Sequence, residues 1–203
     1  MPPSCVNLIE RGLQCEHGLL CVIDGAKGLR KAIDSVFGHQ ALVQRCQWQK
    51  RENMVHYLPK APQLIWRRRL QQAYEGSTYP EARAAPLKLR QELRLVNLSA
   101  VASLDEGFEE TLTLHRLGVF RAVGLSLKTT NCLESLNSQL ERLTKKIAAW
   151  RTADQKHRWV ASALLAEEPW LRHLKGYRHL PQQQAAIQNE LQQVNERKTA
   201  QTA

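Results

Sequence analysis

The chain has 203 residues, of which 43% are hydrophobic and 24% are charged, and its 29 lysines and arginines outnumber 19 acidic residues to give a net charge of +10. These proportions are typical of a globular protein with a packed core, and they exclude a disordered or collagen-like chain. A basic surplus of this size favours a polyanionic partner, of which nucleic acid is the commonest.

Secretion and membrane insertion are not indicated by the sequence. The start of the chain lacks a basic segment followed by a long apolar stretch, and the apolar run 19–23 is far too short to cross a bilayer. The five cysteines include no Cys-x-x-Cys pair, which favours scattered reduced thiols. We therefore expect a cytoplasmic protein with no membrane partner.

The clearest architecture lies in residues 19–46. The apolar run 19–23 ends at Asp24-Gly25, which predicts a buried strand followed by a turn. Apolar residues between 29 and 37 then recur at the three-and-four spacing of an amphipathic helix, which Gly38 can end. Because residues 41–46 again have a strand-like pattern, the segment predicts one strand–helix–strand unit with two parallel strands.

The rest of the chain is predicted to be helical. Breaks are expected at 59–62 and 75–80, and Ser103-x-x-Glu106 is the pattern of a capping box, which predicts a helix start. A long helix is predicted after residue 131, because an apolar stripe runs from Leu133 to Ile147 and needs a packing partner. A further packed helix is expected around 154–167.

These elements divide the chain into four parts and predict an α-rich α/β fold. The parts are a strand–helix–strand segment (1–46), a basic helical insertion (47–116), carboxyl-terminal helices (117–181) and a tail (182–203). The tail holds seven glutamines and few apolar residues, so frayed helix or disorder is expected there.

Asp24 is the first candidate for chemistry. A carboxylate at the carboxyl end of a parallel strand lies where open α/β sheets place their ligands, and its oxygens suit a hard divalent ion such as Mg²⁺. An Asp before Gly is also typical of a turn or of a helix cap. The spacing alone favours the turn or cap over the metal ligand.

Glu134 is the second candidate, at the beginning of the striped helix. Helical geometry turns it away from the apolar stripe, toward Asn137 and Ser138. Asn131-x-x-Glu134 is itself a capping-box pattern, so a structural role is the main alternative.

Basic residues gather in the first half of the helical region. Residues 45–70 hold seven basic side chains and only Glu52 as an acid, which exceeds what a solvated helix face needs and predicts contact with DNA phosphates. The candidate DNA-binding residues are Arg45, Lys50, Arg51, Lys60, Arg67, Arg68 and Arg69, together with Lys128, Lys145 and Lys146 near the long helix.

Cys46 and Trp48 are interpreted as core residues. A zinc site at Cys46 is unsupported, because position 49 is Gln and no second ligand pair has the required spacing. Asn131 and Asn137 are assigned structural roles at the start of the striped helix.

Three segments occur in the order typical of one protein family. They are VIDGAKGLRKA at 22–32, QRCQWQKREN at 44–53 and TTNCLESLN at 129–137, followed by Trp150-Arg151, Arg158-Trp159 and Gly176-Tyr177-Arg178. From about residue 8 to residue 181 the chain resembles the mutator-type bacterial insertion-sequence transposases.

The resemblance implies an RNase H-like core with a large helical insertion and an Asp, Asp, Glu triad that binds two divalent ions, Mg²⁺ or Mn²⁺. Asp24 matches the second Asp and Glu134 matches the Glu, 110 positions later. The implied partners are transposon-end DNA, target DNA and possibly a full-length transposase, and the implied location is the bacterial nucleoid.

The sequence also departs from the family pattern. None of the 23 residues before Asp24 is Asp, Gln49 stands where His is usual, and Cys132 stands where Pro is common. We therefore expect a truncated transposase that retains two of three metal ligands and does not transpose alone. The alternative is a non-catalytic remnant that binds DNA or inhibits the full-length enzyme.

Overall fold

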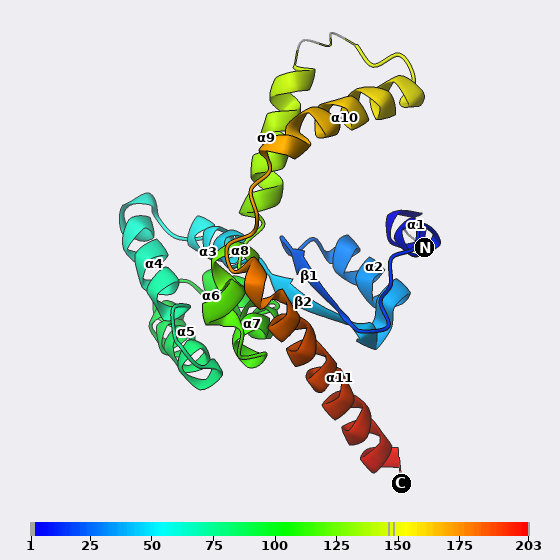
Figure 1. Ribbon diagram of the computed structural model, residues 1–203. Coiled ribbons are helices and arrows are strands. Elements are labelled where there is room, and N and C mark those ends of the chain that lie inside the picture. The colour runs from blue at the N-terminus through cyan, green and yellow to red at the C-terminus, as the bar shows by residue number, and fades with distance from the viewer. Residues whose placement is uncertain (1–2, 146, 148, 203) are drawn as a thin grey trace.

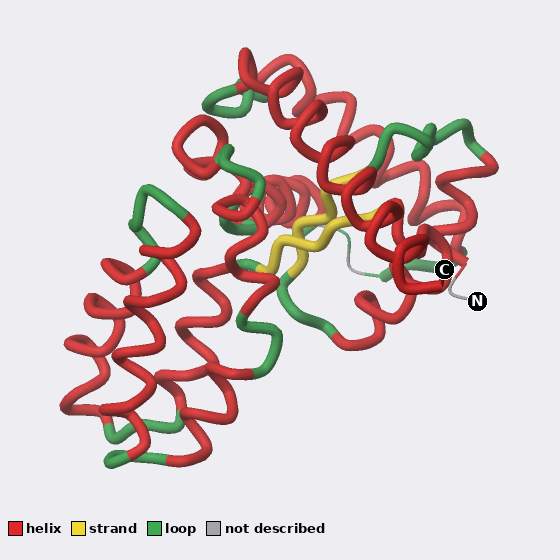
Figure 2. Tube along the Cα trace, turned by 90° about the horizontal axis from the view of Figure 1, so that it is seen from below, coloured by secondary structure: helices red, strands yellow, loops and turns green. Residues whose placement is uncertain are grey.

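The computed structural model describes residues 3–145, 147 and 149–202, with the backbone alone at 3–4 and 197–202. Two strands lie at the centre of the molecule with helices around them, as Figure 2 shows. The fold is therefore helix-rich α/β, in agreement with the fold class expected from the sequence.

The strand–helix–strand unit forms as predicted. β1 (Leu19–Ile23) and β2 (Ala41–Arg45) pair in parallel, with Leu19 opposite Ala41 and Ile23 opposite Arg45. The crossover helix α2 (Lys27–Phe37) ends at Gly38, which has a φ of +54° and starts a short 3₁₀ turn, η1 (Gly38–Gln40). Together with α1 (Pro3–Glu10), these elements bury one apolar cluster.

Four helices form a separate bundle, on one side of the strands in Figure 1. They are α3 (Gln47–His56), α4 (Lys60–Ala73), α5 (Tyr79–Arg94) and α6 (Leu98–Asp105). The predicted breaks at 59–62 and 75–80 overlap the gaps 57–59 and 74–78, but residues 60–62 and 79–80 are already helical. The predicted capping box at Ser103 is wrong, because α6 starts at Leu98 and the Asn97 side chain accepts the Ala100 N–H at 2.9 Å. A capping box forms instead at Thr78 and Glu81.

A third cluster joins the middle of the chain to its end. After η2 (Glu109–Leu112), the helices α7 (Thr113–Arg116) and α8 (Phe120–Leu127) pack with α11 (Leu180–Thr202) through apolar residues that include Ala186. The predicted fraying of the tail is therefore wrong. Ile187 and Gln183 are buried, and Gln184 donates to the His17 carbonyl at 2.6 Å, because the few apolar residues of the tail share one helix face.

Two helices form an arm that projects from the body in Figure 1. They are α9 (Asn131–Thr144) and α10 (Ala153–Glu167), which pack against each other and are followed by η3 (Glu168–Trp170) and η4 (Tyr177–His179). The apolar stripe of α9 is less covered than predicted, since Leu133 stays 53% exposed and no described α9 residue is buried. None of the helices described is long and apolar enough to span a membrane.

Candidate active site

Asp24 lies in an exposed turn at the carboxyl end of β1. Its Oδ1 accepts the Ala26 N–H at 2.9 Å, so it has the turn role that the sequence allowed. It does not cap α2, whose N-cap is Ala26 without a side-chain bond. Gly25, with a φ of +102°, lets this turn close over the Arg45 guanidinium, because a Cβ there would lie 2.4 Å from Arg45 Nε.

Glu134 lies in the first turn of α9, and its side chain is held from two directions. Its Oε1 accepts from Thr130 Oγ1 at 3.1 Å and from Gln49 Nε2 at 3.3 Å. The predicted capping box with Asn131 does not form, because Asn131 is already the first helical residue and the N-cap is Thr130. Residues 130 and 134 lie on the same helix face, which brings the Thr130 hydroxyl to the carboxylate.

Cys46 joins the two candidate regions. It is fully buried, its N–H donates to the Ile23 carbonyl at 2.7 Å, and its Sγ lies 3.5 Å from Thr130 Oγ1. Asp24 directly follows Ile23 in the chain, and Glu134 stands one helical turn after Thr130. The structure therefore brings the end of β1 and the start of α9 to the same buried residue, although no bond joins the two carboxylates.

The fit of a divalent ion to these residues is partial. Both side chains are exposed and offer the oxygen ligands that Mg²⁺ prefers. Among the residues described, however, no three His, Cys, Asp or Glu side chains gather closely enough to hold a metal ion. The chemistry of the two donors suits Mg²⁺ or Mn²⁺, and their number falls short of a complete site.

Comparison with known proteins decides the family. The family model described as "Transposase, Mutator family" matches residues 5–172. The chain belongs to this family. Two curated relatives are transposases for the insertion sequence element IS256 in transposon Tn4001, from Staphylococcus aureus and from Enterococcus faecalis (strain ATCC 700802 / V583). Each is 28% identical over 176 residues, which cover 84% of this chain and 43% of the relative, so the chain spans less than half of their length. No solved structure matches the chain significantly.

Two of the candidate DNA-binding residues of this Mutator-family chain lie inside the protein. Arg45 and Lys50 are buried and both donate to the Glu106 carbonyl, Arg45 at 3.0 Å, while Arg45 Nη2 lies 3.3 Å from the Glu106 carboxylate. Burial, reinforced by the charge of Arg45, lowers the pKa of Lys50 to about 8. These two cations bind the segment after α6 and offer little surface to a phosphate.

The remaining candidates divide into paired and unpaired cations. Ion pairs engage Arg51 and Arg67 with Glu52, Arg69 with Glu92, and Lys128 with Glu75. Lys60, Arg68 and Lys145 are exposed and form no ion pair with the described residues, and Lys146 lies outside them. The local charge counted along 45–70 is therefore partly neutralised by acids that the fold brings from elsewhere in the chain, and DNA contact by these residues stays a prediction.

Lys50 makes stability depend on pH. Its pKa falls from 10.5 to about 8 on folding, so between these values the unfolded chain binds more protons and stability rises with pH. Below about pH 8 the burial of the charge costs about 3 kcal/mol, since each pKa unit corresponds to about 1.4 kcal/mol. Relative to Lys50→Met, the wild-type protein should gain most of this amount as pH rises from about 7 to about 10 and the rest as pH rises past 10.5.

Urea denaturation across this pH range checks the prediction. Lys60→Met is the control, because Lys60 is exposed and its loss should shift the stability equally at every pH. Parallel curves for the wild type and Lys50→Met would show that Lys50 is not buried as a charge.

A buried network of amides, not predicted from the sequence, lies beside these cations. Gln44 is fully buried, donates to the carbonyls of Arg45 and Thr111 at 2.8 and 2.9 Å, and accepts the Leu114 N–H at 3.0 Å. Gln47 also donates to the Thr111 carbonyl, at 2.9 Å. The available signal was an amide that directly follows the apolar residues 41–43 of a predicted strand, because a buried amide requires hydrogen-bond partners.

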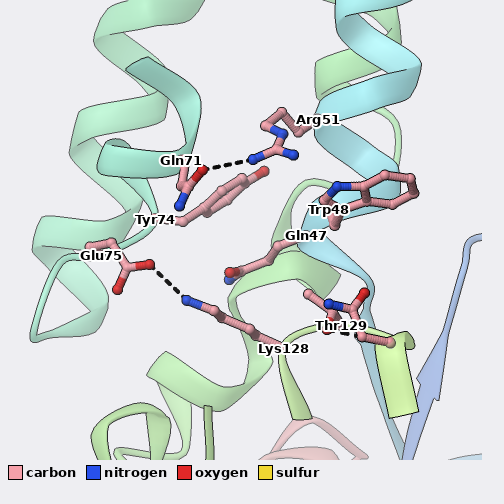
Figure 3. Close-up of a pocket in the computed structure, with 9 residues that line it drawn as sticks. Gln47, Trp48, Arg51, Gln71, Tyr74, Glu75, Lys128 and Thr129 are labelled. Carbon is pink, nitrogen blue, oxygen red and sulfur yellow. Dashed lines mark hydrogen bonds and ion pairs between the residues drawn. The ribbon is translucent and has the colours of Figure 1, made fainter. Parts of the chain in front are cut away.

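The prediction that Trp48 is a core residue is wrong. Cys46 is in the core as expected, but Trp48 is 39% exposed and borders a pocket of about 280 Å³ (Figure 3). Its walls come from α3, the end of α4 and residues 128–131. Asn131 also borders this pocket, whereas Asn137 is exposed on α9.

Proposed function

We propose that this chain carries two metal-binding carboxylates, Asp24 and Glu134, of a transposase that cleaves and transfers DNA strands. Its substrates are transposon-end DNA and target DNA, and its cofactor is Mg²⁺ or Mn²⁺. The observation that carries the proposal is the link through Cys46, which ties the end of β1 to the start of α9 in a member of the Mutator transposase family.

The proposal includes an RNase H-like core. Support comes from the parallel strands β1 and β2, the carboxylate at the end of β1, and the helical bundle that separates it from Glu134 in the chain. Open α/β sheets bind their ligands at this end of the strands. When bound, a pair of divalent ions stabilises the attacking and leaving oxygens of a phosphoryl transfer.

The side chains around Glu134 have a positioning role in this proposal. Thr130 and Gln49 both donate to Oε1, which holds this oxygen in place and leaves Oε2 without a described partner. Gln49 stands where the family usually has His, and its amide supplies the same kind of donor. A third carboxylate and the full-length transposase complete the working assembly.

A second candidate function is a non-catalytic remnant that binds DNA and inhibits the full-length transposase. The specific observation in its favour is that the described residues gather no three metal ligands. On this alternative the exposed Lys60, Arg68 and Lys145 still hold phosphates, with an affinity that falls steeply as salt is raised.

A strand-cleavage assay separates the two functions. The chain is mixed with duplexes bearing the inverted repeats that flank its coding sequence, with and without Mg²⁺ or Mn²⁺, alone and together with the full-length transposase. The first function predicts that the chain adds metal-dependent product to the amount that the full-length transposase forms by itself, and that Asp24→Asn abolishes this added product. DNA retention by the variant stays equal or rises slightly, because a negative charge is removed. Asp154→Asn on α10 is the matched control and should keep the product.

The remaining outcomes are equally informative. Salt-sensitive DNA retention without product, combined with a lower yield from the full-length enzyme, would support the inhibitory remnant. A chain that neither retains end DNA nor forms product would contradict both functions.

A further inference from the structure

The pocket beside Trp48 lies next to Glu134. Trp48 is followed by Gln49, whose amide donates to Glu134 Oε1, and Asn131 borders the pocket less than one helical turn before Glu134. A ligand in this pocket therefore sits beside the candidate catalytic carboxylate.

The walls of the pocket combine aromatic surface with amides. Figure 3 shows the Trp48 ring at the right, Tyr74 to its left, and the Gln47 side chain below Tyr74. Tyr74 is buried, which raises the pKa of its hydroxyl to about 12, so it stays a neutral aromatic wall. Amides at Gln47, Gln71 and Asn131 offer both donors and acceptors, which match the mixed edge of a nucleobase.

The two cations of the pocket are already engaged. Arg51 donates to Gln71 Oε1 at 2.8 Å and to Glu52, and Lys128 donates to Glu75 Oε1 at 2.7 Å, as Figure 3 shows for Gln71 and Glu75. A ligand recognised by charge alone would meet cations that acids neutralise. Gln47 Nε2 and Gln71 Oε1 are engaged as well, by the Thr111 carbonyl and by Arg51. The groups left to recognise a ligand are the exposed indole, Gln47 Oε1, Gln71 Nε2 and the Asn131 amide, which favour a flat, polar-edged ring over a phosphate.

The size of the pocket agrees with one ring system. A volume of about 280 Å³ falls at or below the lower limit of pockets for drug-sized ligands, which begin near 300 Å³. Stacking on an aromatic side chain contributes about 1–3 kcal/mol per base, comparable to the few kcal/mol needed to unstack a base from a duplex.

We propose that this pocket binds a single unpaired nucleobase, next to the phosphodiester that is cleaved at Glu134. The inference rests on the proposed function for its biological setting, because it assigns the base to the DNA strand being processed. Trp48 supplies the stacking surface, and Gln47, Gln71 and Asn131 contact the edge of the base.

Fluorescence anisotropy with EDTA present tests the pocket without metal chemistry. The probe is a labelled duplex interrupted by a short single-stranded gap of thymidines, compared with the same duplex carrying abasic residues in the gap. Wild-type protein should prefer the thymidine gap by about 5- to 150-fold, the range that one stacked base provides. Trp48→Ala should remove the preference, and Trp48→Phe should restore part of it.

Trp170→Ala is the matched control, because Trp170 is 78% exposed in η3 and does not border the pocket, so the preference should remain. The inference is overturned if wild type binds both probes equally, or if Trp48→Ala weakens both by the same factor. A Trp48-dependent preference in a protein that fails the cleavage assay would uphold the pocket and refute the proposed catalysis. Cleavage by a protein with no preference for the thymidine gap would support the proposed catalysis and refute the nucleobase pocket.

Discussion

Gln44→Leu should destabilise the protein by about 4 kcal/mol. Leucine has nearly the same volume, so the effect isolates the lost hydrogen bonds from any cavity. Gln44 is fully buried, and its amide serves the carbonyls of Arg45 and Thr111 and the N–H of Leu114. Gln47 still donates to the Thr111 carbonyl in the variant. The Arg45 carbonyl and the Leu114 N–H lose their amide partner, and each group left unpaired costs about 1–3 kcal/mol.

Urea denaturation of the purified variants measures this loss. The control is Gln40→Leu, the same exchange at a half-exposed position whose side chain has one weak contact, from Cys15 Sγ at 3.5 Å. Its stability should change by less than about 1 kcal/mol, as is usual for surface substitutions. Equal stabilities for the two variants would show that the Gln44 amide does not hold the segment 111–114 against β2.

The elements that the sequence predicted correctly depend on neighbours within the chain. The strand–helix–strand unit and the breaks between α3, α4 and α5 follow from local apolar spacing and from Gly and Pro. The packing of α11 was not predicted, because its glutamine-rich composition hid a single apolar face around Ile187, and that face is stabilised by residues far away in the chain. Helical propensity alone does not show such a partner.

In the candidate site, too, the features set by neighbouring residues were predictable and the contacts between distant residues were not. Asp24 and Glu134 are candidates because of their positions and the family resemblance, and their role as metal ligands stays a prediction. The turn role of Asp24 follows from its sequence and is confirmed by its bond to the Ala26 N–H. The contacts of Glu134 with Gln49 and Thr130 were not predictable from spacing, because Gln49 lies 85 residues away. Likewise, Arg45 and Lys50 resembled surface cations until the fold placed Glu106 and its carbonyl beside them.

Gly176→Ala should destabilise the protein by about 3–4 kcal/mol. Gly176 has a φ of +85°, and a non-glycine residue in this left-handed region costs about 1–2 kcal/mol. A Cβ there would also lie 2.0 Å from the Ala122 carbonyl oxygen, so the loop must move away from α8 at a further cost of about 1–3 kcal/mol. Because η4 and α11 follow directly, the displacement should loosen α11 from its cluster with α8.

Gly118→Ala separates the two contributions. Gly118 has a φ of +68°, yet a Cβ there would meet no atom within 4 Å, so only the backbone strain of about 1–2 kcal/mol applies. Urea denaturation of both variants gives the difference in stability, and hydrogen exchange along α11 shows where it arises. Gly176→Ala should speed exchange in α11 and Gly118→Ala should not. Equal losses in the two variants would mean that contact with Ala122 does not hold the end of the chain in place.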